Sequence, residues 1–474
     1  MKDDRTVAEF LVDHKAKNPI SFHVPGHKGR EEIYRKCGYV NFTSNMVGND
    51  VTAVPGADNL FNPESTILRI EKNYEQLYGV RHTELLVNGS TAGVIAAILT
   101  CVEQGGTLIL ARNSHHSAYS AMRLGDICPV YLRPQVNEDY GVATYIKPED
   151  VREAIELNPE AGAVLVTSPS KIGMLSNVEA IANICHEHGI PLIVDQAHGA
   201  HLKFFDYSSR RKHAAENLGA DIVINSTHKN LFSFTGSAIL NVCSESIDCD
   251  DLKEKLRMIQ TTSPSYMLLG SLDINEKIMT RWGDDIAEKW KDDLRYFYHK
   301  CESIPGLSVV QDPCLDMTKI SISMAALGLS GENLDRELRY NNIWPEMIHG
   351  KYVLLITGAG NTRDDYVELA NVLRRIADKY GIGQKHIKPE IEPIDFELCV
   401  NRIPKKKEKL PLYLADGRVA YSPIVTYPPG TPLICPGEIL NMEVISYISK
   451  ALARDERIVG VDEEGEIYVG IEEW

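Results

Sequence analysis

Positive charge is scarce in this 474-residue sequence, which has 50 Lys and Arg residues against 66 Asp and Glu residues. Its formal net charge is −16 at pH 7. A nucleic-acid binder needs a basic surface that displaces counterions from the phosphate backbone. The densest basic run, Lys405–Lys409, is interrupted by Glu408, and we interpret it as a solvated linker. We therefore expect no nucleic-acid partner.

Long apolar runs and paired cysteines are also absent. No window approaches the roughly 18 consecutive apolar residues of a membrane span, and the charged start MKDDRTVAEF is unlike a signal peptide. The 10 cysteines include no Cys-x-x-Cys pair, so neither a disulfide framework nor a thiolate zinc site is indicated. We expect a soluble, cytoplasmic protein with no membrane partner. The length suggests about three domains.

Short apolar runs alternate with helical patterns between residues 85 and 242. The runs are Leu85–Val87, Leu108–Leu110, Ala163–Val166, Pro191–Val194, Asp221–Ile224 and Ala238–Val242. This alternation predicts an α/β domain with a mainly parallel sheet covered on both faces. One helix is predicted over 177–188, with Ser176 and Glu179 as a capping box and Gly189 at its C-terminal end.

A smaller α+β domain is predicted after this sheet. A charged helical pattern runs over 284–300, and strands at 320–324 and 353–357 alternate with helices near 332–341 and 363–377. The proline-containing stretch 381–411 is then interpreted as a linker into a third unit.

Polar residues follow four of the expected strands, at the ends where open α/β sheets bind ligands. The turn Asn88–Gly93 opens a helix, and its backbone N–H groups and the hydroxyls of Ser90 and Thr91 suit a phosphate. An ordinary helix cap is the alternative. His115 follows the next strand, where a ring can stack on a flat ligand, although a loop histidine can equally be structural.

Asp195 ends a buried strand, and from there a carboxylate can keep a heteroaromatic nitrogen protonated. An Asp that caps a turn is the plainer alternative. Asp195, His198 and His201 could instead ligate a metal. That spacing requires a helix, which Gly199 disfavours, so we expect no metal.

Lys229 lies in the segment Ser226-Thr227-His228-Lys229, which follows the strand at 221–224. Partial burial in such a loop lowers the pKa of a lysine and frees its amine for a Schiff base. A surface lysine is the alternative. A phosphate cradle, a stacking His, a nitrogen-pairing Asp and a Lys, all in one domain, are the parts that a pyridoxal phosphate enzyme requires.

Six segments over nearly the whole chain carry a resemblance to one family. They are Phe22–Lys28, Pro55–Leu60, Leu86–Gly93, Asp195–His201, Ser226–Lys229 and Tyr427–Gly430. In this series the sequence resembles the ornithine/lysine/arginine decarboxylases, which are fold-type-I pyridoxal phosphate enzymes. The resemblance implies four parts: an N-terminal arm (1–60), a large cofactor-binding domain (61–280), a small α+β domain (281–385) and a C-terminal domain (386–474).

The resemblance also implies roles for the site residues. Lys229 would form the Schiff base, Asp195 would pair with the pyridine nitrogen, and His115 would stack on the ring. The remaining residues implied to contact or lie beside the cofactor are Ser90, Thr91, His198, Ser226 and His228. The implied activity is that of a lyase of amino-acid metabolism and polyamine biosynthesis, working as a homodimer with shared active sites. Because Phe22–Lys28 lies so near the N-terminus, we expect a dimer or small oligomer rather than a decamer.

Two departures from the family pattern bear on the substrate. Lys171 replaces a tyrosine, and Ser422 stands where an acid near the distal cation of a basic substrate is expected. Together they change the local charge by about two units, which disfavours a cationic substrate. A neutral, aromatic or acidic amino acid would then be preferred, unless Lys171 points to solvent and Glu346 or Asp58 supplies the acid. Transamination and elimination on the same scaffold, or a non-catalytic or metal-dependent protein, are the other function classes.

Overall fold

The computed structural model of the chain is built around a seven-stranded sheet. The structure describes residues 6–471, apart from 138–139, 141, 208, 210–211, 382–399, 401, 427–431 and 454–457. The strands in spatial order are β2 (His82–Leu86), β10 (Ala238–Val242), β9 (Ile222–Asn225), β8 (Leu192–Asp195), β7 (Ala163–Thr167), β3 (Thr107–Ala111) and β4 (Cys128–Leu132). Strand β10 is antiparallel to both neighbours, and the other adjacent pairs are parallel. The predicted mainly parallel sheet is confirmed.

The edge strand β4 was not predicted from the sequence. It contains Pro129 and pairs on one side with β3. A proline cannot donate to a neighbouring strand, so it is tolerated at an edge but weakens the strand signal in the sequence.

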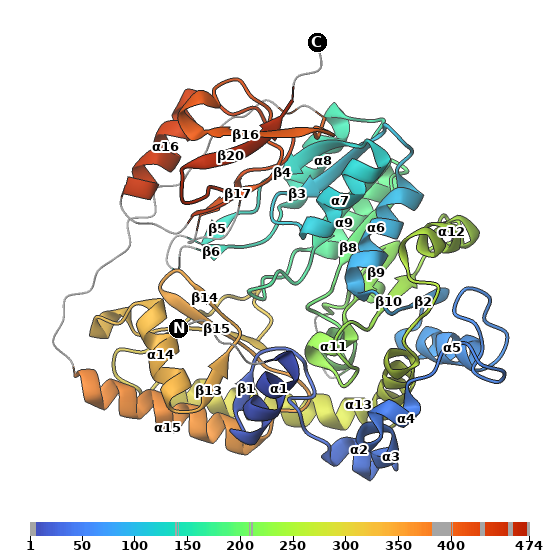
Figure 1. Cartoon of the computed structure of the whole chain (residues 1–474), viewed down its shortest axis with the longest axis vertical. Coiled ribbons are helices and arrows are strands. Elements are labelled where there is room, and N and C mark those ends of the chain that lie inside the picture. Colours follow the sequence, from blue (N-terminus) through green and yellow to red (C-terminus); the bar gives the residue numbers. More distant parts are fainter. Residues whose placement is uncertain are drawn as a thin grey trace.

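Side chains of β3 alternate between apolar clusters on the two faces of the sheet. Leu108 and Leu110 pack in one cluster, and Ile109 packs in the other. Two groups of helices cover these faces, namely α6 (Gly89–Cys101), α7 (His116–Gly125) and α12 (Cys249–Ile259) on one, and α8 (Pro148–Leu157) and α9 (Val178–Glu187) on the other (Figure 1). This arrangement agrees with the predicted covering of both faces.

Helix α9 lies where the sequence predicts it, but another residue caps it. The side chain of Asn177 accepts the N–H of Ala180 at 3.3 Å. The hydroxyl of Ser176 instead accepts the N–H of Ile146 at 3.2 Å. The predicted capping box is therefore wrong, because a tertiary partner takes the Ser176 hydroxyl. Gly189 has the positive φ of 70° that its predicted place at the helix end calls for.

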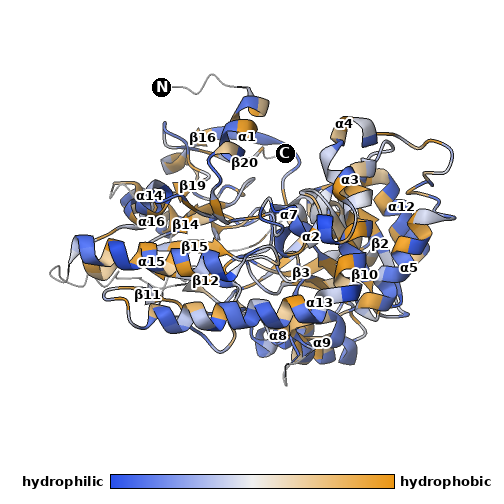
Figure 2. Ribbon diagram, turned by 90° about the horizontal axis from the view of Figure 1, so that it is seen from below, coloured by the Kyte–Doolittle hydropathy of each residue, from blue (hydrophilic) through white to orange (hydrophobic). Residues whose placement is uncertain are grey.

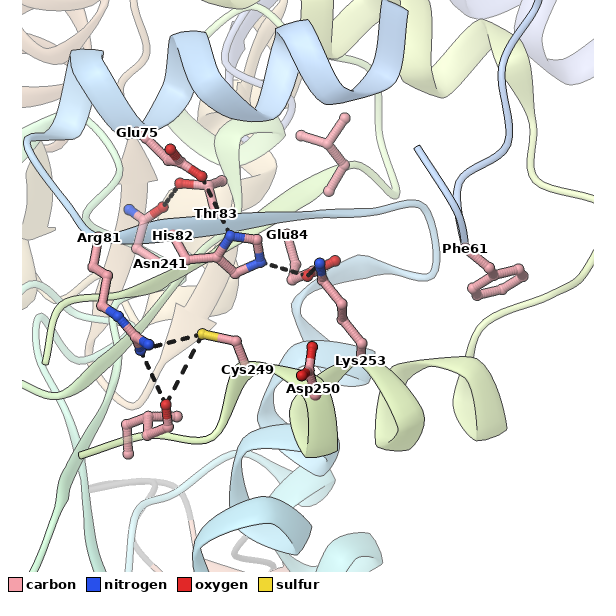
Figure 3. Close-up of polar contacts among 12 residues, drawn as sticks. Phe61, Glu75, Arg81, His82, Thr83, Glu84, Asn241, Cys249, Asp250 and Lys253 are labelled. Carbon is pink, nitrogen blue, oxygen red and sulfur yellow. Dashed lines mark hydrogen bonds and ion pairs between the residues drawn. The ribbon is translucent and has the colours of Figure 1, made fainter. Parts of the chain in front are cut away.

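Helix α5 (Thr66–Tyr78) is held against the edge strand β2 by a charged cluster, shown in Figure 3. His82 of β2 lies between two carboxylates, with Nδ1 3.3 Å from Oε1 of Glu75 and Nε2 2.6 Å from Oε1 of Glu84. Lys253 of α12 lies 3.8 Å from the same Glu84 oxygen. These contacts join α5, β2 and α12, and so fix the strand that leads into α6.

A four-stranded sheet forms the centre of the smaller α+β part. Its strands in spatial order are β11 (Ser308–Val309), β12 (Lys319–Ser323), β15 (Tyr352–Ile356) and β14 (Met347–His349). Helices α14 (Gly331–Tyr340) and α15 (Arg363–Tyr380) accompany it. The two strands and two helices predicted from 320 to 377 are confirmed.

Helix α13 (Tyr266–Cys301) connects the two sheets and begins well before the predicted start at 284. Its early turns bury Leu269, Leu272 and Ile278, and so lack the charged pattern on which the prediction rested. Figure 2 shows hydrophilic and hydrophobic residues alternating along α13 and α15. The predicted domain boundary at 280 falls inside this helix and stays a prediction. In the described part of the chain, no helix is both long and apolar enough to cross a bilayer.

The described residues of the C-terminal region form α16 (Met442–Ala453) and two small sheets. In one of them, β16 (Lys407–Pro411) pairs with β20 (Glu466–Gly470). Part of the basic run interpreted as linker is therefore a strand. Its lysines face water and acids, as with Lys409, whose Nζ lies 3.1 Å from Glu466. Most of the predicted linker, and the Tyr427–Gly430 motif, lie outside the described residues.

Candidate active site

Lys229 lies on α11 (Thr227–Asn230), directly after the carboxyl end of β9. Its Nζ is 3.0 Å from Nε2 of His198, which follows the neighbouring strand β8. Burial lowers the pKa of Lys229 to about 8, while the negative charge of Asp195 opposes this shift. The amine therefore loses its proton far more easily than an ordinary lysine, which makes it a nucleophile near neutral pH.

Asp195 ends β8 and is 5% exposed. Burial raises the pKa of this carboxyl, against the opposing charge of Lys229 and a 3.1 Å hydrogen bond from the N–H of Ala197. A buried carboxylate with few donors around it is suited to a charged N–H partner. A protonated ring nitrogen is such a partner.

The His198 ring is neutral and has one unused nitrogen. Burial, followed by the positive charge of Lys229, lowers the pKa of His198 well below its ordinary value. Its Nδ1 is buried and has no hydrogen-bond partner among the described residues. His201, which the metal hypothesis placed with it, instead points to Asp316, 3.2 Å from Nε2. The two histidines therefore do not converge on one point.

A cradle for an anion forms where β2 leads into α6. Gly89 adopts a φ of +71°, and its N–H donates to the carbonyl of Gly236 at 2.8 Å. Ser90 and Thr91 lie in the first turn, which no side chain caps. The N–H groups of Ser90 and Thr91 are thus available for a phosphate.

Ser226 and His228 belong to the segment that carries Lys229, and His228 bonds to Ser237, the residue after the Gly236 that accepts from Gly89. The Ser226 hydroxyl is fully buried and has no hydrogen-bond partner among the described residues. Nδ1 of His228 lies 2.8 Å from the carbonyl of Ser237, so this nitrogen carries the proton. Burial lowers the pKa of His228 to about 4, which leaves the ring neutral.

His115 caps the N-terminus of α7, where its side chain accepts the N–H of Ser117 at 3.3 Å. Its ring is exposed in the single chain and lies 3.9 Å from the ring of His116, measured between centroids. Partial desolvation and then the charges of His116 and Lys229 lower its pKa to about 4. An exposed neutral ring beside Lys229 can stack on a planar ligand.

The Phe22–Lys28 segment braces the loop that follows Lys229. The N–H of Gly26 donates to the carbonyl of His228 at 2.7 Å, and a Cβ on Gly26 would lie 2.3 Å from the carbonyl carbon of Asn230. Only glycine allows this approach. Lys28 donates to the carbonyl of Ile356 at 2.9 Å, which ties the segment to β15 as well.

The two acids considered for a distal cation differ in their surroundings. Burial alone would raise the pKa of Asp58, but backbone N–H groups hold it well below its ordinary value. Those of Ser65 and Ile67 belong to the start of α5, so Asp58 is engaged in capping that helix. Glu346 accepts the N–H of Val24 at 3.0 Å, and its negative charge raises the pKa of Lys229. Glu346 therefore lies close enough to act on Lys229 through its charge.

The two substituted positions lie in different parts of the molecule. Lys171 is exposed, yet its positive charge contributes to the lowered pKa values of His198 and Lys229, after burial in each case. Ser422 lies just before β17 (Ile424–Thr426) in the C-terminal region and is partly exposed.

Sequence reasoning missed Lys319, which donates to the carbonyl of His198 at 2.9 Å. It begins the buried strand β12, and its side chain is 0% exposed. In the sequence, Lys319 could have been singled out only as a lysine at the start of an apolar strand. Its contact depends on tertiary structure, because His198 is 121 residues away in the sequence.

Comparison with known proteins identifies the class. The family described as Orn/Lys/Arg decarboxylase, major domain, matches residues 7–300, and the C-terminal domain of the same family matches residues 384–467. Fold-type-I architecture agrees with two lysine decarboxylase structures. The Francisella novicida enzyme has a TM-score of 0.73 at 19% identity, and the match covers 94% of this chain and 78% of the Francisella chain. The constitutive enzyme of E. coli has a TM-score of 0.72 at 19% identity, and the match covers 98% of this chain and 83% of the E. coli chain.

Two proteins of Bacillus subtilis (strain 168) are similar over nearly their whole length. An arginine decarboxylase is 29% identical, covering 93% of this chain and 92% of the relative. The uncharacterized protein YaaO is 31% identical, covering 98% of both. The chain thus belongs to the Orn/Lys/Arg decarboxylase family, and it is a pyridoxal phosphate-dependent amino-acid decarboxylase, a carboxy-lyase.

The described residues fit this cofactor. The unpartnered Ser226 hydroxyl and the uncapped first turn of α6 offer donors for a phosphate, and Asp195 offers a carboxylate for a ring nitrogen. Lys229 offers an amine of low pKa for a carbonyl carbon. When bound, pyridoxal phosphate supplies the electron sink that takes up the electron pair left by departing CO₂.

Proposed function

We propose that Lys229 is the lysine that links to pyridoxal phosphate in the α-decarboxylation of an amino acid. The observation that carries this proposal is the 3.0 Å contact between Lys229 Nζ and the neutral His198 ring, beside the buried Asp195. Asp195 keeps the ring nitrogen protonated. Lys229 then supplies the proton that replaces CO₂ on the substrate, because the one proton of the neutral His228 ring is engaged with the Ser237 carbonyl.

The other predicted site residues complete the binding of the cofactor in this proposal. His115 stacks on the ring, and His198 lies beside it. The phosphate contacts are Ser90, Thr91, Ser226 and His228. The free N–H groups at the start of α6 and the buried, unpartnered Ser226 hydroxyl support this assignment.

Arginine is the first substrate to test, with ornithine and lysine next. Relatives named arginine decarboxylase cover 90–93% of this chain, for example 93% for the protein of Bacillus subtilis. The charge of Glu346 acts on Lys229, and it supplies a negative charge for a cationic side chain in this proposal. The amine left after decarboxylation of arginine, ornithine or lysine would enter polyamine biosynthesis.

A neutral, aromatic or acidic substrate is the second candidate. Lys171 adds positive charge near His198 and Lys229, and Ser422 offers no carboxylate. Both changes raise the free energy of binding a cationic side chain.

A panel of amino acids with the pyridoxal phosphate-loaded enzyme decides between these substrates. We expect CO₂ release to exceed keto-acid formation, and release from arginine to exceed that from all non-basic amino acids. Faster release from a neutral or acidic amino acid would favour the second candidate. Keto acid as the main product would contradict decarboxylation and favour transamination.

We further propose a cytoplasmic homodimer with shared active sites. Helix α1 (Val7–Ala16) buries none of its residues in the single chain, and Val7, Leu11 and Val12 are 77%, 58% and 69% exposed. Met46 and Val47 of α4 (Met46–Asn49) are 63% and 91% exposed. Apolar surface of this kind is expected to be covered by a second copy. Analytical ultracentrifugation should give a dimer, and Leu11→Asp should weaken it.

A further inference from the structure

A buried ion pair lies behind His198, on the side of the small sheet. The side chains of Lys319 and Asp316 are 0% and 1% exposed. The Lys319 ammonium has three donors, and they meet the carbonyl of His198 at 2.9 Å, Asp316 Oδ2 at 3.0 Å and Thr318 Oγ1 at 3.0 Å. A buried ammonium whose donors are all satisfied is held in one position.

Asp316 extends this pair to two loops beside the site. Its Oδ1 accepts from the N–H of Thr318 at 3.0 Å and from Nε2 of His201 at 3.2 Å. Its own N–H donates to the carbonyl of Gly173 at 2.8 Å, in the loop that carries Lys171. The pair therefore connects the small sheet to both loops.

We propose that Lys319 is a positioning residue, which holds the backbone carbonyl of His198 and thereby keeps the His198 imidazole 3.0 Å from the amine of Lys229. The inference rests on the proposed role of Lys229. It assigns to the small domain a direct part in preparing the reactive amine.

Lys319 also acts on Lys229 through its charge. Burial is the main cause of the lowered pKa of Lys229; among the charged groups that face it, Asp195 and Glu346 raise the pKa, and Lys171 and Lys319 lower it. Of these two lysines, Lys171 has the larger effect but is exposed, and Lys319 is buried against the His198 carbonyl. Lys319 thus favours the uncharged, nucleophilic form of the amine.

The test removes both charges of the pair together, in Asp316→Asn/Lys319→Met. Replacing both partners avoids the cost of leaving one buried charge alone, and the amide introduced by Asp316→Asn keeps an oxygen for His201 and Thr318. Two measurements use the full-length chain. One is the pH dependence of Lys229 labelling by an amine reagent after cofactor removal, followed by peptide mass spectrometry. The other is the pH titration of the absorbance band of the pyridoxal phosphate-loaded enzyme.

We expect the double variant to label Lys229 about threefold more slowly at pH 7. Both titration midpoints should move to higher pH, because the orienting contact on His198 is lost together with the Lys319 charge, which lowers the pKa of Lys229, whereas the Asp316 charge removed with it is not among the charges that raise that pKa. Unchanged labelling and an unchanged absorbance titration in a folded double variant would overturn the proposal.

Lys291→Met is the matched control. Lys291 is a buried lysine whose Nζ donates to another backbone carbonyl, that of Phe205, at 2.6 Å, and pairs with Glu288 at 2.9 Å. This variant should lower thermal stability and leave Lys229 labelling unchanged. A shift in Lys229 labelling equal to that of the double variant would reduce Lys319 to a structural residue and overturn the proposal.

If the double variant does not fold, Thr318→Val replaces it in both measurements. It removes one acceptor of the Lys319 ammonium and leaves both charges in place, so a smaller shift in the same direction is expected. No shift in Thr318→Val would then count against the proposal. Failure of the wild-type chain to form the absorbance band would contradict the role of Lys229 itself, whereas the labelling measurement still reports on Lys319.

Discussion

At the scale of single residues, Lys229 is the group on which the proposed chemistry depends. Lys229→Ala removes the amine that lies beside His198 and Asp195. We expect the pyridoxal phosphate absorbance band of a linked lysine to disappear and CO₂ release to fall at least about a hundredfold. Lys72→Ala is the control, because Lys72 pairs at the surface with Glu75 at 2.9 Å. A linked band that persists in Lys229→Ala would place the link at another lysine.

The lowered pKa of Lys229 also predicts how cofactor binding depends on pH. The uncharged amine is the nucleophile, and burial lowers its pKa to about 8. The rate constant for pyridoxal phosphate binding to the apoenzyme should therefore rise about tenfold per pH unit below pH 8 and level off above it. Stopped-flow absorbance measures this profile. A midpoint near the ordinary lysine value of 10.5 would contradict it.

The sequence predicts the residues of this site that follow strands of one sheet. Asp195, His198 and Lys229 follow adjacent parallel strands, so their proximity comes from the alternation of strands and helices. Lys319 and Glu346 could not be placed in this way. Lys319 begins β12 of the small sheet, and Glu346 lies just before β14 of the same sheet, so their distance from Lys229 depends on how two separately formed sheets pack.

At the scale of elements, long periodic segments were predictable and their ends were not. Strands β7 to β10 and helices α14 and α15 have strong apolar patterns, and they were predicted to within a few residues. Strand β4 was missed because of Pro129. The cap of α9 is Asn177 rather than Ser176, because the Ser176 hydroxyl bonds to Ile146. Such tertiary competition leaves no periodic signal.

Glu71 of helix α5 is 1% exposed, and its titration makes the free energy of unfolding depend on pH. Burial and then the charge of Glu84 raise its pKa from 4.5 to about 9. Between these values the folded chain keeps a proton that the unfolded chain releases, so the free energy of unfolding falls as pH rises from 4.5 to 9. Glu71→Gln removes this dependence.

The free energy of unfolding of Glu71→Gln, measured relative to that of wild type, should therefore be roughly 2–4 kcal/mol higher at pH 8 than at pH 5. Chemical denaturation at the two pH values measures the difference. Glu153→Gln is the control, since Glu153 is an exposed glutamate on α8. Equal effects of Glu71→Gln at both pH values would mean that Glu71 is ionised in the folded chain.

At the scale of the whole molecule, one buried ion pair joins the large sheet to the C-terminal region. Arg112 follows β3 and leads into the loop of His115, and Glu438 lies 326 residues further along the chain. Arg112 Nη2 donates to Glu438 Oε2 at 2.9 Å and to the carbonyl of Leu433 at 2.9 Å. The two side chains are 7% and 2% exposed. No local sequence pattern could predict a contact between segments so far apart.

Glu438→Ala leaves the Arg112 guanidinium buried without its carboxylate, which should cost about 3–5 kcal/mol of folding free energy. Because Arg112 lies three residues before His115, loosening this contact should also weaken pyridoxal phosphate binding. Thermal unfolding and a cofactor titration measure the two effects. Glu408→Ala is the control, because Glu408 pairs with Arg418 near the surface, where an ion pair contributes about 1 kcal/mol or less. A loss of stability in Glu438→Ala with unchanged cofactor affinity would show that the C-terminal region stabilises the fold without acting on the site.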